Sequence, residues 1–469
     1  MWNPLGFPVS PPYDESIYIR RTIEVLFNYS PQEGPLYDHP FFLQIFLAAI
    51  LWPVLNSISS NLVAGDVHSI ELIYLIFKVA MGILSVIGTL LVYEIAKRYY
   101  NRNVAFIASI IFAVMPITLT LRNVFLEPVQ LPFLLISILF AVCVKKGLVK
   151  ENGSNNKNKN KNRNRNTLIL TLLSGIFLGL TLFTKISAFT FIPLIGYLLF
   201  SNRATENRDF KSITLWLIPI VLIPSFWPAY ALYEDQLDLW FKGIFFQTHR
   251  TAQSFFSSLN VDFNRDPVFL MIGIAGVVFS VVIKRDVLIL LWVVPFLFYL
   301  YFIGFVSHWH FIPIFPAFCI AGANMITGLS DMIAKIAKRN GKFQKILPYV
   351  IIGAIGIFGI VNTSIMITAI DKSINEPHYK AAAFVVNYLQ NNEEVNKVSS
   401  DDNTNGITVI SHPFLSWSYS LYHIKAFHVD YYNSPVSVNT KHVLLVSDPV
   451  LTYRLNQNLV DKEIEKYLH

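Results

Sequence analysis

Charged residues and cysteines are both scarce in this sequence. Charged residues make up 14% of the 469 residues, whereas an ordinary soluble domain carries about 25%. This shortage excludes a typical soluble globular protein for most of the chain. The two cysteines, Cys143 and Cys319, both lie inside apolar runs, so a disulfide framework is not indicated.

Apolar residues are correspondingly abundant. They make up 54% of the chain, and the mean hydropathy is +0.48. A helix needs about 20 mostly apolar residues to cross the hydrocarbon core of a bilayer, and such runs recur along the chain. The sequence therefore predicts an all-α polytopic membrane protein with about ten transmembrane helices. The predicted spans are 71–95, 104–121, 128–144, 167–183, 186–200, 212–230, 267–283, 287–304, 311–329 and 347–369.

One boundary between spans follows from length alone. As a single helix, residues 167–200 would be about 51 Å long, which exceeds the roughly 30 Å hydrocarbon core. Thr184 and Lys185 interrupt this apolar run. We therefore expect a turn at these two residues, between two short spans.

The distribution of lysine and arginine predicts which loops face the cytoplasm. One set of loops holds 21 basic residues and the opposite set holds 7. Because basic loops stay on the cytoplasmic side, the first set is cytoplasmic, and we expect a multi-pass plasma-membrane protein. The net charge of +7 therefore does not indicate a nucleic-acid partner. The basic loops are 96–103, 145–166, 201–211, 284–286 and 330–346.

This orientation divides the chain into three regions. Residues 1–70 form an extracytoplasmic first loop, in which the apolar stretch 41–59 is an interfacial or re-entrant helix. Residues 71–369 form the transmembrane domain, with a basic, disordered cytoplasmic loop at 151–166 and an outer loop at 231–266. Residues 371–469 predict a small extracytoplasmic α/β domain. Its expected elements are helices at 381–389 and 464–468 and strands at 407–410 and 442–446.

Ionisable residues collect where the predicted outer loops meet the span ends. Such residues are costly at membrane depth and are candidates for a functional site. A lipid-phosphate leaving group needs cations, an acceptor hydroxyl needs a carboxylate base, and carboxylates with imidazoles could hold a divalent metal ion. The mixture therefore fits transfer of a sugar from a lipid phosphate to a hydroxyl. The residues concerned include Asp14, Glu15, His39, Lys78, Arg122, Glu127, Lys185, Arg250, His308 and His310.

Five short motifs follow one another through this part of the chain: Asp14-Glu15, His39-Pro40-Phe41, Arg122 to Glu127, Gly175 to Lys185, and Phe311 to Pro316. In this order, and on one predicted side, they resemble motifs of the GT-C glycosyltransferase superfamily. The likeness is to its protein O-mannosyltransferase and aminoarabinose-transferase-like families in particular. Each motif alone is weak, whereas five in order are specific.

The resemblance implies a role for the acid pair and for the cations. Asp14 would be the catalytic base, with Glu15 as its neighbour at the acceptor or a metal. Arg122 and Lys185 would hold the donor phosphate. Further phosphate-binding candidates are Lys78, Arg250 and His310.

The resemblance also implies a second acid, and the chain departs from the family pattern there. Glu127 stands where the families usually have Asp, and His310 stands where they often have Arg. With His39 and His308, Glu127 is a candidate ligand of a divalent metal ion. No organic cofactor is implied.

The implied function is that of an integral-membrane glycosyltransferase. It would transfer a hexosyl or pentosyl group from a dolichyl- or undecaprenyl-phosphate sugar to a protein, lipid or glycan acceptor on the outer face. Two other functions stay open: a transporter or lipid flippase, and a non-catalytic assembly partner. Transporters usually carry internal repeats, and none is visible in this sequence.

Each motif also has a purely structural explanation. The Asp14-Glu15 pair could stabilise the start of a helix through its dipole. Arg122 and Lys78 could anchor span ends by extending toward the interface. The histidines beside Trp309 could belong to an interfacial aromatic belt.

The beginning of the chain differs from the families that it resembles. Those families have a span before the acidic loop, whereas 13 residues precede Asp14. We therefore expect the true start to lie upstream of Met1 and to add roughly 20 apolar residues. The rival expectation is an outside N-terminus that a later span or a neighbouring subunit carries across.

Overall fold

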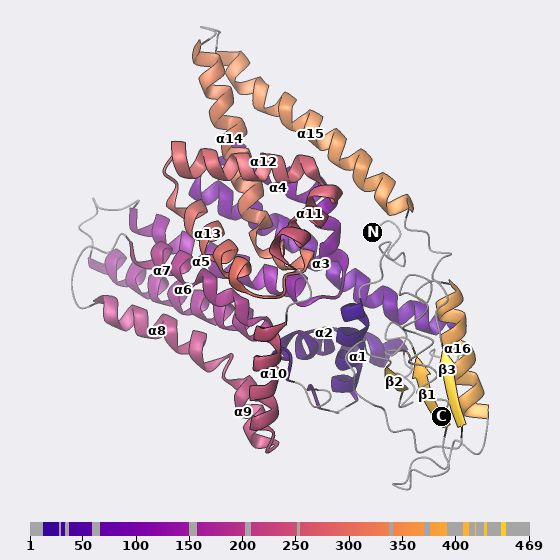
Figure 1. Cartoon of the computed structure of the whole chain (residues 1–469). Helices are drawn as coiled ribbons and strands as arrows, with labels where there is room; N and C mark the ends of the chain where they lie inside the picture. Colours follow the sequence, from indigo (N-terminus) through magenta and orange to yellow (C-terminus); the bar gives the residue numbers. More distant parts are fainter. Residues whose placement is uncertain are drawn as a thin grey trace. The chain divides into compact units, whose positions relative to one another are not determined.

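The structure, a computed structural model, falls into two compact units. Unit 1 comprises Met1–Pro31, Gln44–Val79 and Ile367–His469, and unit 2 comprises Gln32–Leu43 and Ala80–Met366. Figure 1 shows the elements in chain order. The residues described are 13–27, 30–32, 37–58, 66–149, 157–201, 208–250, 254–336, 341–369, 376–391, 407–411, 418, 426–428 and 442–446.

Unit 2 is built from helices. Its elements are α4 (Arg102–Val114), η2 (Pro116–Arg122), α5 (Leu126–Val149), α6 (Lys157–Thr184), η3 (Ile186–Phe191), α7 (Ile192–Phe200), α8 (Arg208–Leu222), α9 (Phe226–Tyr233), α10 (Leu237–His249), α11 (Phe255–Arg265), α12 (Pro267–Val278), the π-helical turn η4 (Phe279–Ile283), α13 (Val287–Phe302), η5 (His308–Ile314), α14 (Phe315–Ile336) and α15 (Gly341–Ala369). The later part of α3 (Val67–Tyr99) also belongs to this unit.

Each of the ten predicted spans coincides with a helix or with a bent pair of helices, which confirms the polytopic helical class. Among the described residues, five helices are long and apolar enough to cross a membrane, or up to eight candidates if each bent pair counts as one span. The predicted spans 186–200 and 287–304 form shorter apolar helices instead, Ile186–Phe200 and Val287–Phe302. The sharpest bend, 117°, separates α11 from α12.

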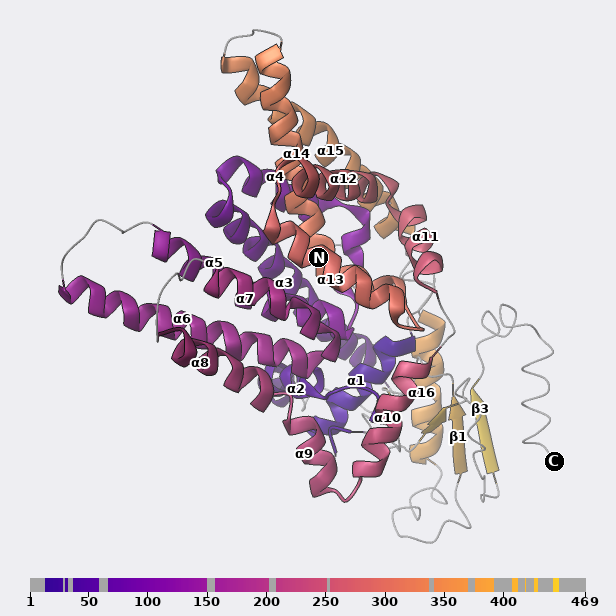
Figure 2. The same ribbon diagram turned by 60° about the vertical axis from the view of Figure 1, so that its left-hand side comes forward.

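Glycines let helices of unit 2 approach at backbone distance. A β-carbon on Gly175 or Gly179 of α6 would lie 2.5 or 2.4 Å from a carbonyl oxygen of α8. Small residues at such spacing allow close packing of transmembrane helices. The glycine motif that precedes Lys185 therefore fixes α6 against α8, and Figure 2 shows these two helices side by side.

The helix ends that the sequence assigns to the cytoplasmic side meet one another. Lys145, near the end of α5, lies 3.9 Å from the ring centroid of Tyr197 and 5.7 Å from that of Tyr99. The Tyr100 hydroxyl donates to the carboxylate of Asp286, just before α13. The predicted grouping of loops is thus consistent with the packing of unit 2.

Residues 157–166 differ from the prediction. The sequence predicts a disordered loop at 151–166, whereas α6 begins at Lys157 and continues without a break to Thr184. Once an apolar helix has formed, each further residue adds a hydrogen bond at little cost, so the helix extends into its polar flank. Residues 151–156 lie outside the described part of the chain.

Unit 1 combines N-terminal and C-terminal segments. It contains α1 (Tyr13–Leu26), most of α2 (Phe42–Ile58), the first part of α3, and α16 (Glu376–Asn391). Three strands complete it: β1 (Ile407–Ser411), β2 (Ala426–His428) and β3 (His442–Val446). Tyr74 of α3 contacts Tyr379 of α16 with ring centroids 6.3 Å apart.

The strands form a parallel sheet in the order β2-β1-β3. Helix α16 and strands β1 and β3 lie where the sequence predicts a helix and two strands. The expected helix at 464–468 lies outside the described residues. The stretch predicted as interfacial or re-entrant, 41–59, forms α2, a short apolar helix that contains Pro53.

Candidate functional site

Lys185 occupies a break between two helices. Helix α6 ends at Thr184, Lys185 is extended (φ −155°, ψ 125°), and η3 begins at Ile186. The predicted turn is therefore confirmed. The break turns the Lys185 side chain toward α5 instead of continuing the helix, so the residue is placed by the α6 terminus and its glycine contacts with α8.

Gln130 of α5 fastens this break. Its Nε2 donates to the carbonyl oxygens of Thr181 and Lys185, at 3.3 and 3.0 Å. Each of these carbonyls also accepts a backbone N–H, Thr181 from Lys185 at 3.1 Å and Lys185 from Ala188 at 3.2 Å, so Gln130 adds a second donor at the end of α6. The side chain is fully buried, which makes the α5–α6 contact specific in register.

Glu127 and Lys185 form a buried ion pair. Glu127 lies in the first turn of α5, and its Oε1 accepts a hydrogen bond from the Lys185 ammonium. The two side chains are 3% and 11% exposed. Removing one partner of such a pair leaves an uncompensated buried charge, which is strongly unfavourable. The two residues are therefore a coupled unit.

His310 approaches the same carboxylate oxygen. Its Nε2 lies 3.8 Å from Glu127 Oε1. The backbone N–H of Ser307 donates to His310 Nδ1 at 2.7 Å, as part of a capping box at the start of η5. Because Nδ1 accepts this bond, the proton of the neutral ring is on Nε2. His310 therefore presents an N–H donor to Glu127.

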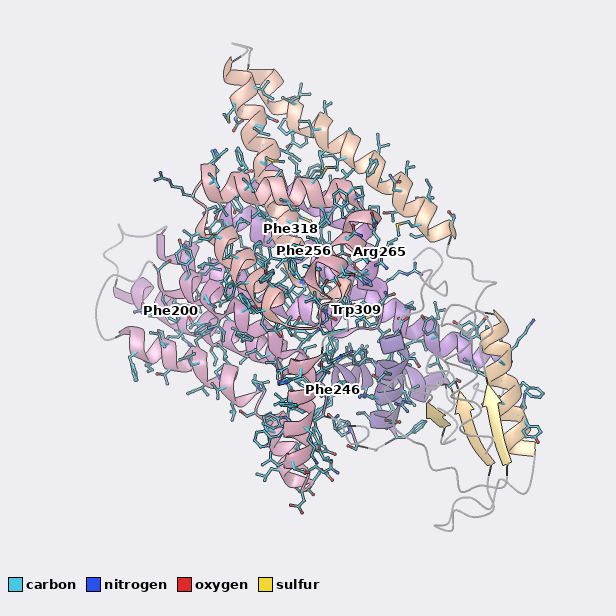
Figure 3. All side chains as sticks on the ribbon, viewed as in Figure 1. Phe200, Phe246, Phe256, Arg265, Trp309 and Phe318 are labelled. Carbon is cyan, nitrogen blue, oxygen red and sulfur yellow. The ribbon has the colours of Figure 1, made fainter. Side chains whose placement is uncertain are left out.

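Two more predicted residues lie near this cluster, which we call the Glu127 cluster (Glu127, Lys185 and His310). His39 and Arg250 are both close enough to act electrostatically on the His310 ring. The Arg250 guanidinium lies 3.9 Å from the ring centroid of Phe305 and 5.4 Å from that of Phe246, which is labelled in Figure 3. A guanidinium over aromatic faces is attracted electrostatically by the ring quadrupoles.

The segment that carries His39 is held by the outer loop. Tyr37 is buried, and its hydroxyl donates to Gln236 Oε1 at 2.9 Å. Burial, then the charges of Tyr230 and Glu234, raise the pKa of Tyr37 to about 12, so the hydroxyl stays a donor at neutral pH. The His39 backbone N–H donates to Asp38 Oδ1 at 2.9 Å.

Arg122 and His308 also belong to unit 2. Arg122 is half-buried at the last residue of η2. His308 lies edge-on to Trp309, with ring centroids 4.7 Å apart, and is electrostatically coupled to Arg265. Glu127 is one of the three predicted metal ligands, and its carboxylate accepts a hydrogen bond from the Lys185 ammonium. His39, near the Glu127 cluster, and His308, against Trp309, are both half-buried.

The described residues do not fit the predicted divalent metal. Within them, no group of three or more His, Cys, Asp or Glu side chains is arranged to hold an ion. Glu127 directs an oxygen at Lys185, and an ammonium at that position repels a second cation. We therefore derive no step through a metal.

Unit 1 holds a second buried ion pair. Glu15 of α1 accepts hydrogen bonds from the Lys78 ammonium and, at 3.0 Å, from the Tyr74 hydroxyl. All three side chains are buried, and the Lys78 ammonium also lies 5.0 Å from the Tyr74 ring centroid. Asp14 is the second residue of α1, and its side chain lies outside the described part. The pair therefore ties α1 to α3.

Some contributors escaped the sequence analysis. Gln130 carries a visible signal, since it is a polar residue inside a predicted span. Nothing in the sequence distinguishes Tyr74 and Ser307 from other tyrosines and serines. Their importance comes from a hydroxyl bonded to Glu15 and from the cap that fixes the His310 ring.

The chain matches a known family over part of its length. Residues 68–229 match the family described as dolichyl-phosphate-mannose-protein mannosyltransferase. This range contains Lys78, Arg122, Glu127 and Lys185. None of the curated proteins matches the sequence.

Solved structures share the fold. ArnT from Cupriavidus metallidurans, bound to undecaprenyl phosphate, aligns with a TM-score of 0.57 at 11% identity, over 92% of this chain and 83% of that chain. The Archaeoglobus fulgidus oligosaccharyltransferase AglB, in complex with an inhibitory peptide and a dolichol-phosphate, gives a TM-score of 0.53 at 12% identity, over 90% and 60%. A complex of the archaeal enzyme with Zn and sulfate gives 0.52 at 12%, over 90% and 58%.

The predicted resemblance to GT-C glycosyltransferases is confirmed by the family match and the shared fold. The predicted enzyme class, a glycosyltransferase, is that of the matched family and of both kinds of structural neighbour. The chain spans about three fifths of the archaeal oligosaccharyltransferase, 59–61% in three of its structures.

Proposed function

We propose that this chain transfers a sugar from a polyprenyl-phosphate donor to a hydroxyl of a protein, lipid or glycan acceptor on the extracytoplasmic face. The observation that carries the proposal is the Lys185 ammonium, buried at the break between α6 and η3 beside Glu127 and His310. Preorganised cations in a site that excludes water are what a phosphate leaving group needs. The ligands of the structural neighbours, undecaprenyl phosphate and dolichol-phosphate, agree with this substrate class.

The proposed reaction is a displacement at the anomeric carbon of the donor. The acceptor oxygen forms a bond to that carbon, while the bond from the carbon to the phosphate oxygen breaks and leaves its electron pair on the phosphate. The acceptor proton passes to the Asp14 carboxylate, a general base by the resemblance. Lys185 and Arg122 neutralise the charge that grows on the leaving phosphate.

Glu15 and Lys78 receive a supporting role in this proposal. The sequence places Glu15 at the acceptor or a metal and Lys78 at the donor phosphate. Their burial and mutual bonding favour a different task, namely holding the first turn of α1, which carries Asp14, against α3. A side chain locked by packing and hydrogen bonds positions its neighbours within the narrow limits that catalysis requires.

Sidedness and the C-terminal domain complete the proposal. The bias of basic residues toward one set of loops supports an extracytoplasmic site. The parallel sheet with α16 supports an α/β domain at the C-terminus, which we place on the same side and in which we expect contacts to the acceptor.

A transfer assay with purified protein in detergent tests the function. Wild-type protein and Asp14→Asn are incubated with a panel of polyprenyl-phosphate sugars and with hydroxyl-bearing peptides, lipids and glycans. Transfer by the wild type, lost in the variant, supports the enzyme. If no sugar is transferred while reconstituted vesicles move the lipid across the bilayer, the flippase reading replaces it.

A further inference from the structure

The Glu127–Lys185 pair presents a difficulty for any phosphate ligand. Lys185 is expected to bind a phosphate, yet its ammonium already bonds to a carboxylate in a place that water scarcely reaches. Two anions beside one cation repel each other strongly where the dielectric constant is low. A phosphate and the Glu127 carboxylate therefore compete for Lys185.

Lys185 can exchange one anion for another at a lower free-energy cost than it can lose its anion altogether. Pulling the carboxylate away leaves a buried ammonium without a counterion, which is costly. An incoming phosphate removes that cost because it supplies the missing negative charge. Anion exchange at Lys185 is thus much easier than opening the pair in the absence of a ligand.

His310 provides a place for the displaced carboxylate. Its Nε2–H lies 3.8 Å from Glu127 Oε1, which is beyond hydrogen-bonding distance. The Ser307 backbone N–H holds the ring through Nδ1, so the Nε2–H keeps its direction. A small shift of Glu127 away from Lys185 completes this bond and satisfies the carboxylate. The rings of His310 and Trp309 lie 6.3 Å apart between centroids, and Trp309 is labelled in Figure 3.

We propose that Glu127 is the resident counterion of Lys185 and that the phosphate of a lipid phosphate, donor or product, displaces it toward His310. This inference rests on the proposed function and assigns Glu127 a task within it. A polyprenyl-phosphate sugar carries one negative charge and the polyprenyl phosphate that it leaves carries up to two. Return of Glu127 to Lys185 then competes with the product and promotes its release.

The test measures binding of undecaprenyl phosphate to purified protein in detergent, with uncharged undecaprenol as the control lipid. When a competent state is only partly populated, the apparent affinity falls by that fraction. In Glu127→Gln the resident anion is gone, and we expect the dissociation constant for undecaprenyl phosphate to fall about 10-fold or more. The affinity for undecaprenol stays unchanged. Lys185→Ala added to Glu127→Gln abolishes the gain.

A second variant covers the case in which Glu127→Gln does not fold. Glu127→Asp keeps the charge but withdraws it by one methylene, and we expect a smaller gain in affinity. Glu94→Gln, which removes a half-exposed carboxylate paired with Lys97 on α3, is the matched control and leaves binding unchanged. Unchanged or weaker binding of undecaprenyl phosphate by either folded Glu127 variant overturns the counterion role.

The binding experiment distinguishes failure of the counterion role from failure of the proposed function. A wild-type protein that binds undecaprenyl phosphate no better than undecaprenol contradicts the donor class, and the counterion role with it. A wild-type protein that binds and transfers, with no tightening in the Glu127 variants, contradicts the counterion role alone.

Discussion

Gly243 and Tyr37 touch through their backbones. A β-carbon on Gly243 of α10 would lie 2.1 Å from the Tyr37 carbonyl oxygen and 2.6 Å from its carbonyl carbon. No side chain can move aside to relieve such a contact, because both clashing atoms belong to the main chain. The segment that carries Asp38 and His39 can therefore pack against α10 only because residue 243 has no β-carbon.

We expect Gly243→Ala to displace this segment. Overpacking of this kind costs about 1–3 kcal/mol, and it should lower both thermal stability and transfer activity. Gly353→Ala is the control, since among the described residues no atom beyond its own stretch of helix lies within 4 Å of a β-carbon there. Thermal unfolding in detergent and a transfer assay compare the two. If Gly243→Ala and Gly353→Ala have the same unfolding temperature and the same transfer activity, the packing of the His39 segment on α10 is not important for either property.

Asp14→Asn should reduce transfer by about 10²–10⁴-fold, because an amide cannot take the acceptor proton. The variant should be expressed and should unfold like the wild type. Asp238→Asn is a suitable control, since this carboxylate is two-thirds exposed and pairs with Lys242 on the surface of α10. Initial rates at saturating donor decide the question, and near wild-type rates for Asp14→Asn would remove the general base from the mechanism.

Lys185→Ala and Arg122→Ala should each impair use of the donor. Loss of a charged contact in a preorganised site costs about 2–4 kcal/mol of transition-state stabilisation. Lys185→Ala also strands Glu127, so the double variant Lys185→Ala/Glu127→Gln should unfold at a higher temperature than Lys185→Ala alone. Lys242→Ala controls for loss of a surface cation. If both variants use the donor with wild-type kinetics, Lys185 and Arg122 do not bind the phosphate and only anchor the ends of the spans.

The Glu15–Lys78 pair should behave as a structural unit. Glu15→Gln or Lys78→Met alone should destabilise the protein by about 3–5 kcal/mol, since each breaks a buried ion pair. The double variant should recover much of this loss. The half-exposed Glu94–Lys97 pair should give about 0–1 kcal/mol in the same double-mutant cycle. Additive losses at Glu15 and Lys78 would show that the two residues do not act together.

The sequence predicts much of the membrane region because length and hydropathy determine it. The turn at Thr184-Lys185 follows from a run too long for one crossing, and the structure breaks the helix at that point. The two short apolar helices at 186–200 and 287–302 are also visible as apolar runs. What composition cannot show is how far a helix extends past its apolar part, and α6 begins at Lys157, ten residues before the predicted span.

The two buried ion pairs could not be predicted. The sequence presents Lys78 and Lys185 as cations awaiting a phosphate, because it shows which residues are charged but not which touch. Glu15 and Lys78 are 63 residues apart, and their contact depends on how α1 packs on α3. The tautomer of His310 depends on a single backbone N–H, which no motif records.

The order of synthesis gives these pairs a consequence for assembly in the membrane. Glu15 is made 63 residues before Lys78, and Glu127 is made 58 residues before Lys185. In each case the acid emerges from the ribosome before the lysine with which it pairs in the folded protein. Because an unpaired charge is costly in the bilayer, we expect α5 to reach its final depth only after α6 and Lys185 have been made. We therefore expect α5 and α6 to enter the membrane together as a hairpin, joined by the Glu127–Lys185 pair.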